Sequence, residues 1–297
     1  MVRIRKQPEP ADEVRRGAYY VVMTDPFALA GAALSVPVAL DAYKRLLGPS
    51  FDLMGEGIKS GLLNRRSNIH RVAERADAKT NTHTPGSIPP RVAADVFDKA
   101  QWADDEFVAE YLSGVLASSR SDDGRDDRGI VWTSLVGRLS SDSLRLHYAI
   151  FSALRAKLRG KDVDYMGQWT QRHLVLNYYD LLPGLEFEFN QDGIRRLLDA
   201  AYVLEREGLI SGMTHGSAEH FTGVPYRDYV LPDFGDIFMT ATTIEGCNLF
   251  LYGHGYGATW ASAIADDQRD FASWPAIAPS LNSIPAVWLD ELPHKAR

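Results

Sequence analysis

Cysteine is almost absent from this sequence, because Cys247 is the single one among 297 residues. One cysteine cannot form a disulfide within the chain, and it cannot build a metal site from several thiolates. Cys247 lies in the apolar run GCNLF at 246–250. We therefore expect a buried and unreactive thiol at this position rather than a nucleophile.

Long hydrophobic runs are also missing. The uncharged part of the first apolar run extends from Pro26 to Leu40, has 15 residues and contains Pro37. A helix that spans a membrane needs about 20 apolar residues, so this run is too short. We expect it to be a buried helix or a partner contact, and association with a membrane surface is the alternative. The contact residues predicted for either case are Phe27, Leu29, Leu34, Val36 and Val38.

Catalytic signatures form a third absence. The sequence contains no Gly-x-Ser-x-Gly, no His-Glu-x-x-His and no Cys–His pairing. The glycine-rich GHGYG at 253–257 matches neither the dinucleotide fingerprint nor the P-loop, so a turn is the better interpretation. His215 and His220 could approach a metal, but a spacing of five residues in a loop is common by chance. We therefore predict no catalytic, cofactor-binding or metal-binding residue and expect a protein that is not an enzyme.

Charge of one sign is not in large excess. The chain has 32 basic and 39 acidic residues, a net charge of −7, with 45% hydrophobic residues. This composition is typical of a globular protein, and the acidic balance argues against nucleic acid as the main partner. The cations of residues 1–17 stand beside two prolines, which predicts a flexible basic arm. No signal-peptide pattern follows the charged start, so we expect a cytoplasmic protein, with a peripheral position at the inner membrane as the alternative.

Apolar periodicity predicts a mainly α protein of the α+β class. Residues 18–139 form the predicted helical region, interrupted by a loop over 80–90 and with a fresh helix start at Asp104, Asp105 and Glu106. Residues 140–257 form a predicted winged-helix-like domain with a small β-hairpin. Residues 258–297 form a tail rich in tryptophan and proline, which we expect to pack on the body because so many aromatics are unusual in disordered chain.

The winged-helix prediction rests on the order of its elements. One helix begins at Ser140, a second begins at Asn190 or Asp192, and Gly208 ends the second with the left-handed residue of a helix C-terminus. A strand is expected from Leu209, a return strand over 226–231 and a short helix over 232–238. Between the two main helices, the aromatic-rich stretch predicts another short helix over about 171–181.

DNA binding is the function that a winged helix suggests first. The second helix would enter the major groove, and Arg195, Arg196 and, on the wing, Arg227 are the candidate nucleic-acid contacts. From 186 to 210, however, three arginines stand against six carboxylates, which leaves a net charge of −3. Since neutralisation of phosphate supplies much of the affinity for DNA, a protein-binding or structural winged helix is favoured.

Several short motifs resemble the abortive-infection alpha (Abi-alpha) domain family over roughly residues 40–240. They are LLGPS at 46–50, IPP at 88–90, WADDE at 102–106 with YL at 111–112, LEREGLI at 204–210 and LPDFG at 231–235. The resemblance implies a bacterial, cytoplasmic, helical protein of phage defence and carries over no catalytic residue. The leading hypothesis is thus a non-enzymatic interaction protein of phage defence. A winged-helix DNA-binding regulator and a membrane-associated effector that uses residues 18–40 are the alternatives.

Overall fold

The structure is a computed structural model that describes residues 66–80, 86–164, 167–221, 226, 228–232, 235–271, 274, 280–281 and 284–295. Over these residues the fold is mixed α/β, with eight helices and one sheet of four antiparallel strands. The predicted arm over 1–17 and the predicted contact residues Phe27, Leu29, Leu34, Val36 and Val38 lie outside the described residues, as does Arg227.

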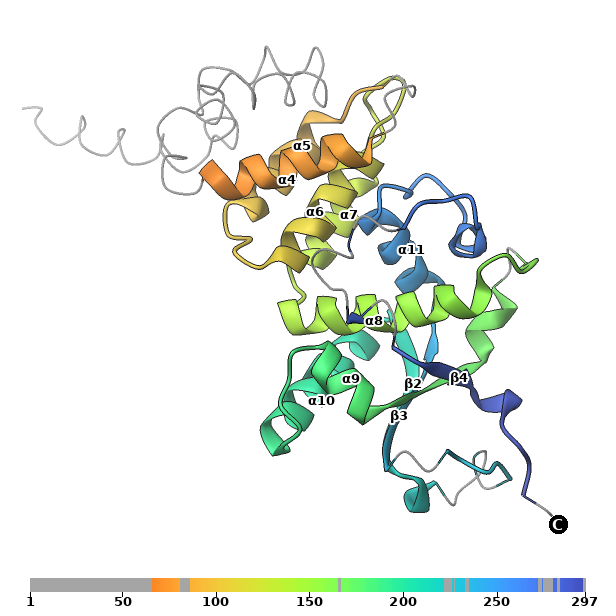
Figure 1. Cartoon of the computed structure of the whole chain (residues 1–297). Helices are drawn as coiled ribbons and strands as arrows, with labels where there is room; N and C mark the ends of the chain where they lie inside the picture. The colour runs from red at the N-terminus through yellow and green to blue at the C-terminus, as the bar shows by residue number, and fades with distance from the viewer. Residues whose placement is uncertain are drawn as a thin grey trace, which may run out of the picture.

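Four helices gather at one end of the molecule (Figure 1). They are α4 (Arg66–Lys79), α5 (Pro90–Ala100), α6 (Glu106–Ser118) and α7 (Gly129–Val136). The α6 start confirms the expectation for this stretch, because the Asp105 side chain accepts a hydrogen bond from the Phe107 backbone nitrogen at 2.8 Å. The cations of α4 contact α6. Arg71 pairs with Glu106 at 2.6 Å, and Lys79 pairs with Glu110 at 2.5 Å.

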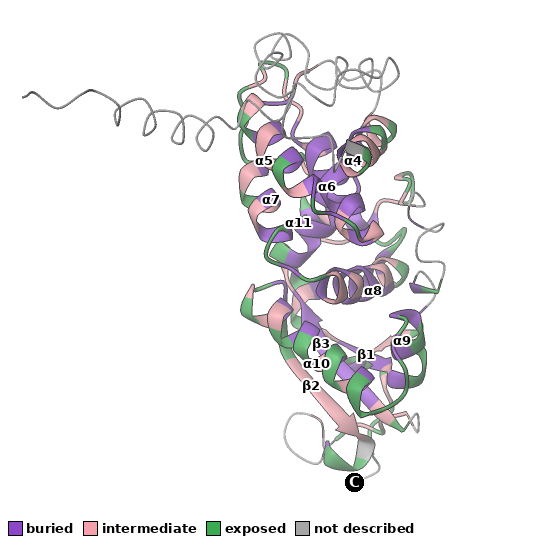
Figure 2. Cartoon of the chain, turned by 90° about the vertical axis from the view of Figure 1, so that its left-hand side faces the viewer, coloured by how far each residue is buried: buried purple, intermediate pink, exposed green. Residues whose placement is uncertain are grey.

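Helix α8 (Ser141–Leu158) crosses the middle of the molecule between these helices and the sheet (Figures 1 and 2). The Ser140 side chain caps it by accepting a hydrogen bond from the Ser143 backbone nitrogen at 3.1 Å, as the sequence predicts. Helix α10 (Gln191–Arg206) packs against α8 and is capped by Asn190. Gly208 follows it with φ of +72°, the left-handed conformation expected at this helix end.

The sheet has the order β2-β3-β1-β4. Its strands are β1 (His173–Asn177), β2 (Ile210–Ser217), β3 (Asp236–Thr242) and β4 (Ala286–Trp288). β2 pairs with β3 through a register shift at 211–214, where Gly212 has φ of +59°. β1 pairs with β3 on one side and with β4 on the other, so it is an inner strand.

Three predicted elements are wrong in type or position. The return strand lies at β3 and not over 226–231, where Tyr229 forms only an isolated bridge with His294. The helix expected over 232–238 is replaced by the start of β3. The helix expected over 171–181 is divided into β1 and α9 (Tyr178–Gly184), with the Asn177 side chain capping α9.

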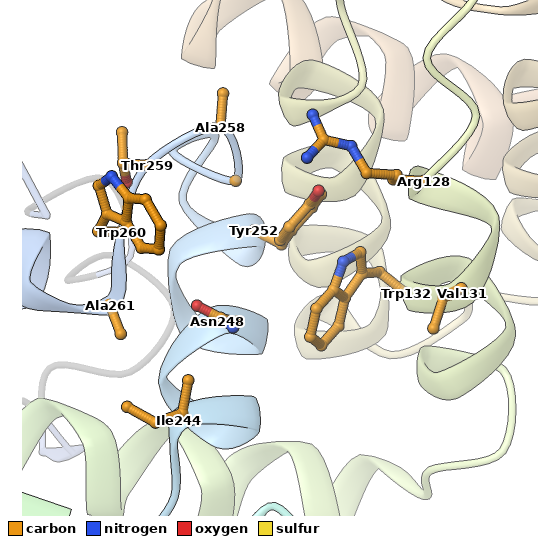
Figure 3. Close-up of a pocket in the computed structure, with 11 residues that line it drawn as sticks. Arg128, Val131, Trp132, Ile244, Asn248, Tyr252, Ala258, Thr259, Trp260 and Ala261 are labelled. Carbon is orange, nitrogen blue, oxygen red and sulfur yellow. The ribbon is translucent and has the colours of Figure 1, made fainter. Parts of the chain in front are cut away.

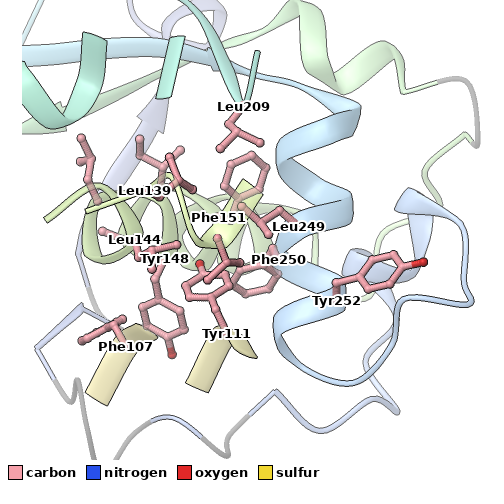
Figure 4. Close-up of a cluster of buried hydrophobic side chains, with 14 of the residues drawn as sticks. Phe107, Tyr111, Leu139, Leu144, Tyr148, Phe151, Leu209, Leu249, Phe250 and Tyr252 are labelled. Carbon is pink, nitrogen blue, oxygen red and sulfur yellow. The ribbon is translucent and has the colours of Figure 1, made fainter. Parts of the chain in front are cut away.

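One hydrophobic core extends from Ile69 to Trp288 and includes residues of all three predicted regions. Its centre lies between α6, α8 and α11 (Ile244–Gly253), where Tyr148 and Phe250 face one another (Figure 4). The Trp274 ring stacks on the Tyr148 ring at a centroid distance of 4.6 Å. Trp274 and Trp288 are both fully buried. Two tryptophans from beyond residue 258 are therefore part of the same core as the helices.

Candidate functional site

An open groove of about 820 Å³ lies between α7 and α11. A short segment after α11, residues 257–261, forms its third side (Figure 3). The residues that line it are mostly apolar or aromatic; they are Arg128, Val131, Trp132, Ile244, Asn248, Tyr252, Gly257, Ala258, Thr259, Trp260 and Ala261. A groove of this composition is suited to apolar contacts with a ligand or a partner.

Helix periodicity builds the α11 wall of the groove. Ile244, Asn248 and Tyr252 are four residues apart and therefore share one face of the helix (Figure 3). Thr243 fixes the start of this helix, because its hydroxyl accepts a hydrogen bond from the Gly246 backbone nitrogen at 3.0 Å. The Tyr252 ring stacks on Trp132 of α7 at a centroid distance of 4.9 Å and an interplanar angle of 28°. This pair closes one end of the groove with a rigid aromatic surface.

The glycine-rich turn after α11 leads into residues 257–261, which form the third side of the groove. A Cβ at Gly257 would lie 2.5 Å from the Tyr252 ring, so only glycine permits this close approach. The Gly257 backbone nitrogen donates to the Ser118 hydroxyl at 3.0 Å, and the Thr259 hydroxyl donates to the Tyr256 carbonyl at 2.7 Å. The turn presents Trp260, which is 75% exposed, while Val131 on the α7 side is 66% exposed. An exposed tryptophan of this kind is unusual outside interaction surfaces.

Electrostatics contribute little to the groove. Arg128 is the only charged residue among its described lining residues, and its Nε donates to both Asp126 carboxylate oxygens at 2.8 and 2.9 Å. This hydrogen bonding lowers the pKa of Asp126, and burial raises the pKa of the Tyr252 hydroxyl. Arg128 therefore has a carboxylate beside it already, and the groove favours apolar side chains over charged ones.

A buried polar cluster around Lys79 connects α4, α6 and α11. Burial lowers the pKa of Lys79 to about 8. The Lys79 ammonium nevertheless donates to the Glu110 carboxylate, to the Ser113 hydroxyl at 2.9 Å and to the Gly253 carbonyl at 2.9 Å. Together with the Glu110 carbonyl, four acceptors on α6 and α11 use the donors of this lysine, so it connects the helices rather than offering a nucleophile.

Two buried histidines next to this cluster are also held by the fold. His147 Nε2 donates to the Gly246 carbonyl at 2.9 Å, which leaves its Nδ1 to accept from the Tyr111 hydroxyl at 2.5 Å. His254 Nδ1 donates to the Phe250 carbonyl at 2.7 Å. Burial lowers the pKa of each histidine to about 3. Neutral imidazoles this deep in the core contribute to packing and hydrogen bonding.

The residues singled out in the sequence do not converge on one site. Arg195 pairs with Asp192 at 2.5 Å, and Arg196 pairs with Asp142 at 2.8 Å.

Cys247 is buried as expected, its thiol donates to the Ala261 carbonyl at 3.3 Å, and burial raises its pKa. Within the described ranges, no group of three or more His, Cys, Asp or Glu side chains could hold a metal ion. None of the described helices combines the length and the apolar character that a bilayer span requires.

Sequence reasoning missed the groove. The spacing of Ile244, Asn248 and Tyr252 was a readable signal for one of its walls. Trp260 was expected only as part of a packed tail, and nothing local indicates that it faces residues of α7, which are more than a hundred positions earlier. Comparison with protein-family models, with curated proteins and with solved structures finds no match for this chain.

Proposed function

We propose that this chain is a non-enzymatic protein-interaction module whose groove between α7 and α11 receives an amphipathic helix of a partner protein. The observation that carries the proposal is that the exposed Trp260 and the stacked Trp132 and Tyr252 rings line the same groove. Large aromatic side chains supply most of the energy of protein interfaces, and helix-in-groove binding uses an apolar cleft between elements.

The dimensions and chemistry of the groove favour such an occupant. Two of its walls are helices, and their lining residues present carbon surface with one amide, Asn248, between them. A helix with two or three large aliphatic side chains on one face would bury those side chains against the three rings. The Asn248 amide offers one hydrogen bond to orient the partner.

Phage defence is the biological setting that we propose, and it rests on the Abi-alpha-like motifs of the sequence alone. The non-enzymatic character is supported by the full hydrogen bonding of Lys79 and by the depth of His147 and His254. We assign the winged-helix-like succession of α8, α10, β2 and β3 a structural role. DNA binding is not favoured, because Arg195 and Arg196 already face carboxylates.

The test compares two exposed tryptophans. A photo-crosslinking residue is placed at Trp260 or at Trp102, which is 62% exposed and does not line the groove. In phage-infected cells, crosslinks to one discrete partner are expected from position 260 and not from position 102. Affinity is then measured with the purified partner and with a synthetic peptide of its crosslinked segment.

The alanine variants give the quantitative result. Trp260→Ala should weaken binding by about 2 kcal/mol, roughly thirtyfold, as expected for loss of a central aromatic, and should reduce phage protection. Trp102→Ala should keep both affinity and protection. Equal effects of the two variants, or a crosslinked segment without an amphipathic helix, would refute the proposal.

A further inference from the structure

A second cavity, of about 270 Å³, lies where α8 meets α11 and residues 269–271. Its lining residues are Tyr148, Ser152, Arg155, Ala156, Arg159, Phe250, Arg269, Asp270 and Phe271, none of which lines the groove. Three guanidinium groups and one carboxylate therefore surround a small volume. This charge balance is opposite in sign to that of the chain as a whole.

The helix places two of the cations and a hydroxyl on one face. Ser152, Arg155 and Arg159 are spaced by three and four residues along α8. Arg155 is held in position by carbonyls, because its Nη2 donates to the Asp266 and Arg269 carbonyls at 3.0 and 3.1 Å. It also donates to the Ile264 carbonyl. These contacts fix Arg155 and do not involve Arg159.

The two arginines that α8 contributes to the cavity are not paired with a described carboxylate. Within the described part of the chain, neither Arg155 nor Arg159 has a carboxylate within 4.0 Å, whereas Arg269 pairs with Asp266 at 3.0 Å. Burial and then the nearby Arg159 charge lower the pKa of Arg155. A bound anion would relieve the repulsion between the two guanidinium groups.

Aromatic rings form the other side of the cavity. Tyr148, Phe250 and Phe271 line it, and the Phe250 and Phe271 rings stack at a centroid distance of 5.7 Å. The Arg155 guanidinium lies 3.9 Å from the centre of the Phe271 ring. Tyr148 and Phe250 are buried, so the aromatic surface that the cavity exposes is the half-buried Phe271 ring beside the Arg155 guanidinium.

We propose that this cavity binds a small molecule that carries a phosphate group and an aromatic ring, of the size of a nucleoside monophosphate. The guanidinium fork of the exposed Arg159 matches phosphate oxygens in geometry and charge, Arg155 adds positive charge beside it, and Ser152 adds a hydroxyl donor. The half-buried Phe271 ring accepts the base, and the cavity volume of about 270 Å³ is just below the usual range for ligand pockets, about 300–1,000 Å³. This site is independent of the groove and of the partner proposed for it.

Isothermal titration of the full chain tests the assignment with three probes, which are adenosine monophosphate, inorganic phosphate and adenosine. The monophosphate should bind saturably and more tightly than either fragment, because only it uses both the cations and the rings. Binding should weaken as sodium chloride is raised. Absence of saturable binding of the monophosphate at millimolar concentration would overturn the proposal, and equal affinity for phosphate and the monophosphate would overturn the role of the rings.

A matched pair of variants locates the site. Arg159→Ala and Lys161→Ala each remove one exposed cation near the end of α8, and only Arg159 lines the cavity. Arg159→Ala should weaken the affinity for adenosine monophosphate by about tenfold, the factor for one charge-assisted hydrogen bond, and Lys161→Ala should leave this affinity unchanged. Thermal melting of both variants checks that they are folded. Equal affinities of the two variants would show that the ligand does not bind at this cavity.

Discussion

Acidification should destabilise this protein well before its carboxylates titrate, because two histidines are buried in the neutral form. His147 and His254 are 0% and 4% exposed, and burial lowers the pKa of each to about 3. The positive charges of Lys79 and Arg155 lower the pKa of His254 further, whereas the carbonyls of Gly246 and Phe250 act in the opposite direction. Between about pH 3 and about pH 6.5 the two histidines are therefore neutral in the folded state and protonated in the unfolded chain.

The magnitude follows from linkage between protonation and folding. Each histidine has a folded pKa far below its unfolded value of about 6.5, so its contribution is complete above that value and is lost as the pH falls. One such group costs about 1.4 kcal/mol per pH unit, and the pair should cost about 4 kcal/mol between about pH 7 and about pH 5. His173 and His215 act in the same direction, since burial lowers the pKa of each. A loss of this size is a large part of a typical folding free energy, about 5–15 kcal/mol.

Equilibrium urea unfolding, followed by tryptophan fluorescence across this pH range, measures the effect. His254→Gln should remove about half of the pH dependence, about 2 kcal/mol, whatever it does to the absolute stability. Leu154→Ala, at a buried position without a titrating group, should lower stability equally at each pH and leave the slope unchanged. A free energy of unfolding that changes by less than about 1 kcal/mol over the range, or a slope that His254→Gln leaves intact, would contradict the reasoning.

Three further predictions concern individual positions. Gly114→Ala should lower the free energy of unfolding, measured in urea, by at least about 3 kcal/mol, because the added Cβ would lie 1.9 Å from a backbone carbonyl oxygen of α11. Gly160→Ala, the control, should lower it by only about 1 kcal/mol, because this position has φ of +70° but open space around it. Ser140→Ala should cost about 1 kcal/mol in the same measurement through loss of the α8 cap, and an unchanged midpoint would contradict that role. Cys247 should not react with a thiol-specific reagent in the native protein and should react at once in urea; rapid native labelling would contradict its burial and raised pKa.

Local signals predicted the two long helices α8 and α10 well. A capping serine followed by an apolar stripe identifies α8, and Asn190 with Gly208 brackets α10 closely, because both ends depend on side chains within a few positions. Among the strands, β2 lies where a strand was expected from Leu209, but β1, β3 and β4 were not predicted at their positions. β1 is a five-residue run of which the three central residues are buried, and such a run does not alternate in the way that distinguishes a strand from a short helix. Its partners are found only by long-range pairing.

The candidate site was beyond local reasoning for a related cause. The groove combines residues of α7, α11 and the turn that follows α11, and its shape depends on how these elements pack. The acidic balance around α10 is visible in the structure as two ion pairs, of Arg195 with Asp192 and of Arg196 with Asp142. Composition thus indicates the net charge of a surface, whereas the location of a cavity is known only once the tertiary structure is known.

The position of β1 has a consequence for biosynthesis. This strand leaves the ribosome before both of its neighbours, β3 and β4, so its backbone donors and acceptors stay unsatisfied by the sheet while most of the second half of the chain is translated. Nascent chains of intermediate length therefore present an apolar strand with two open edges, which is a template for aggregation. Expression with more of the chaperones that shield nascent chains should raise the soluble yield.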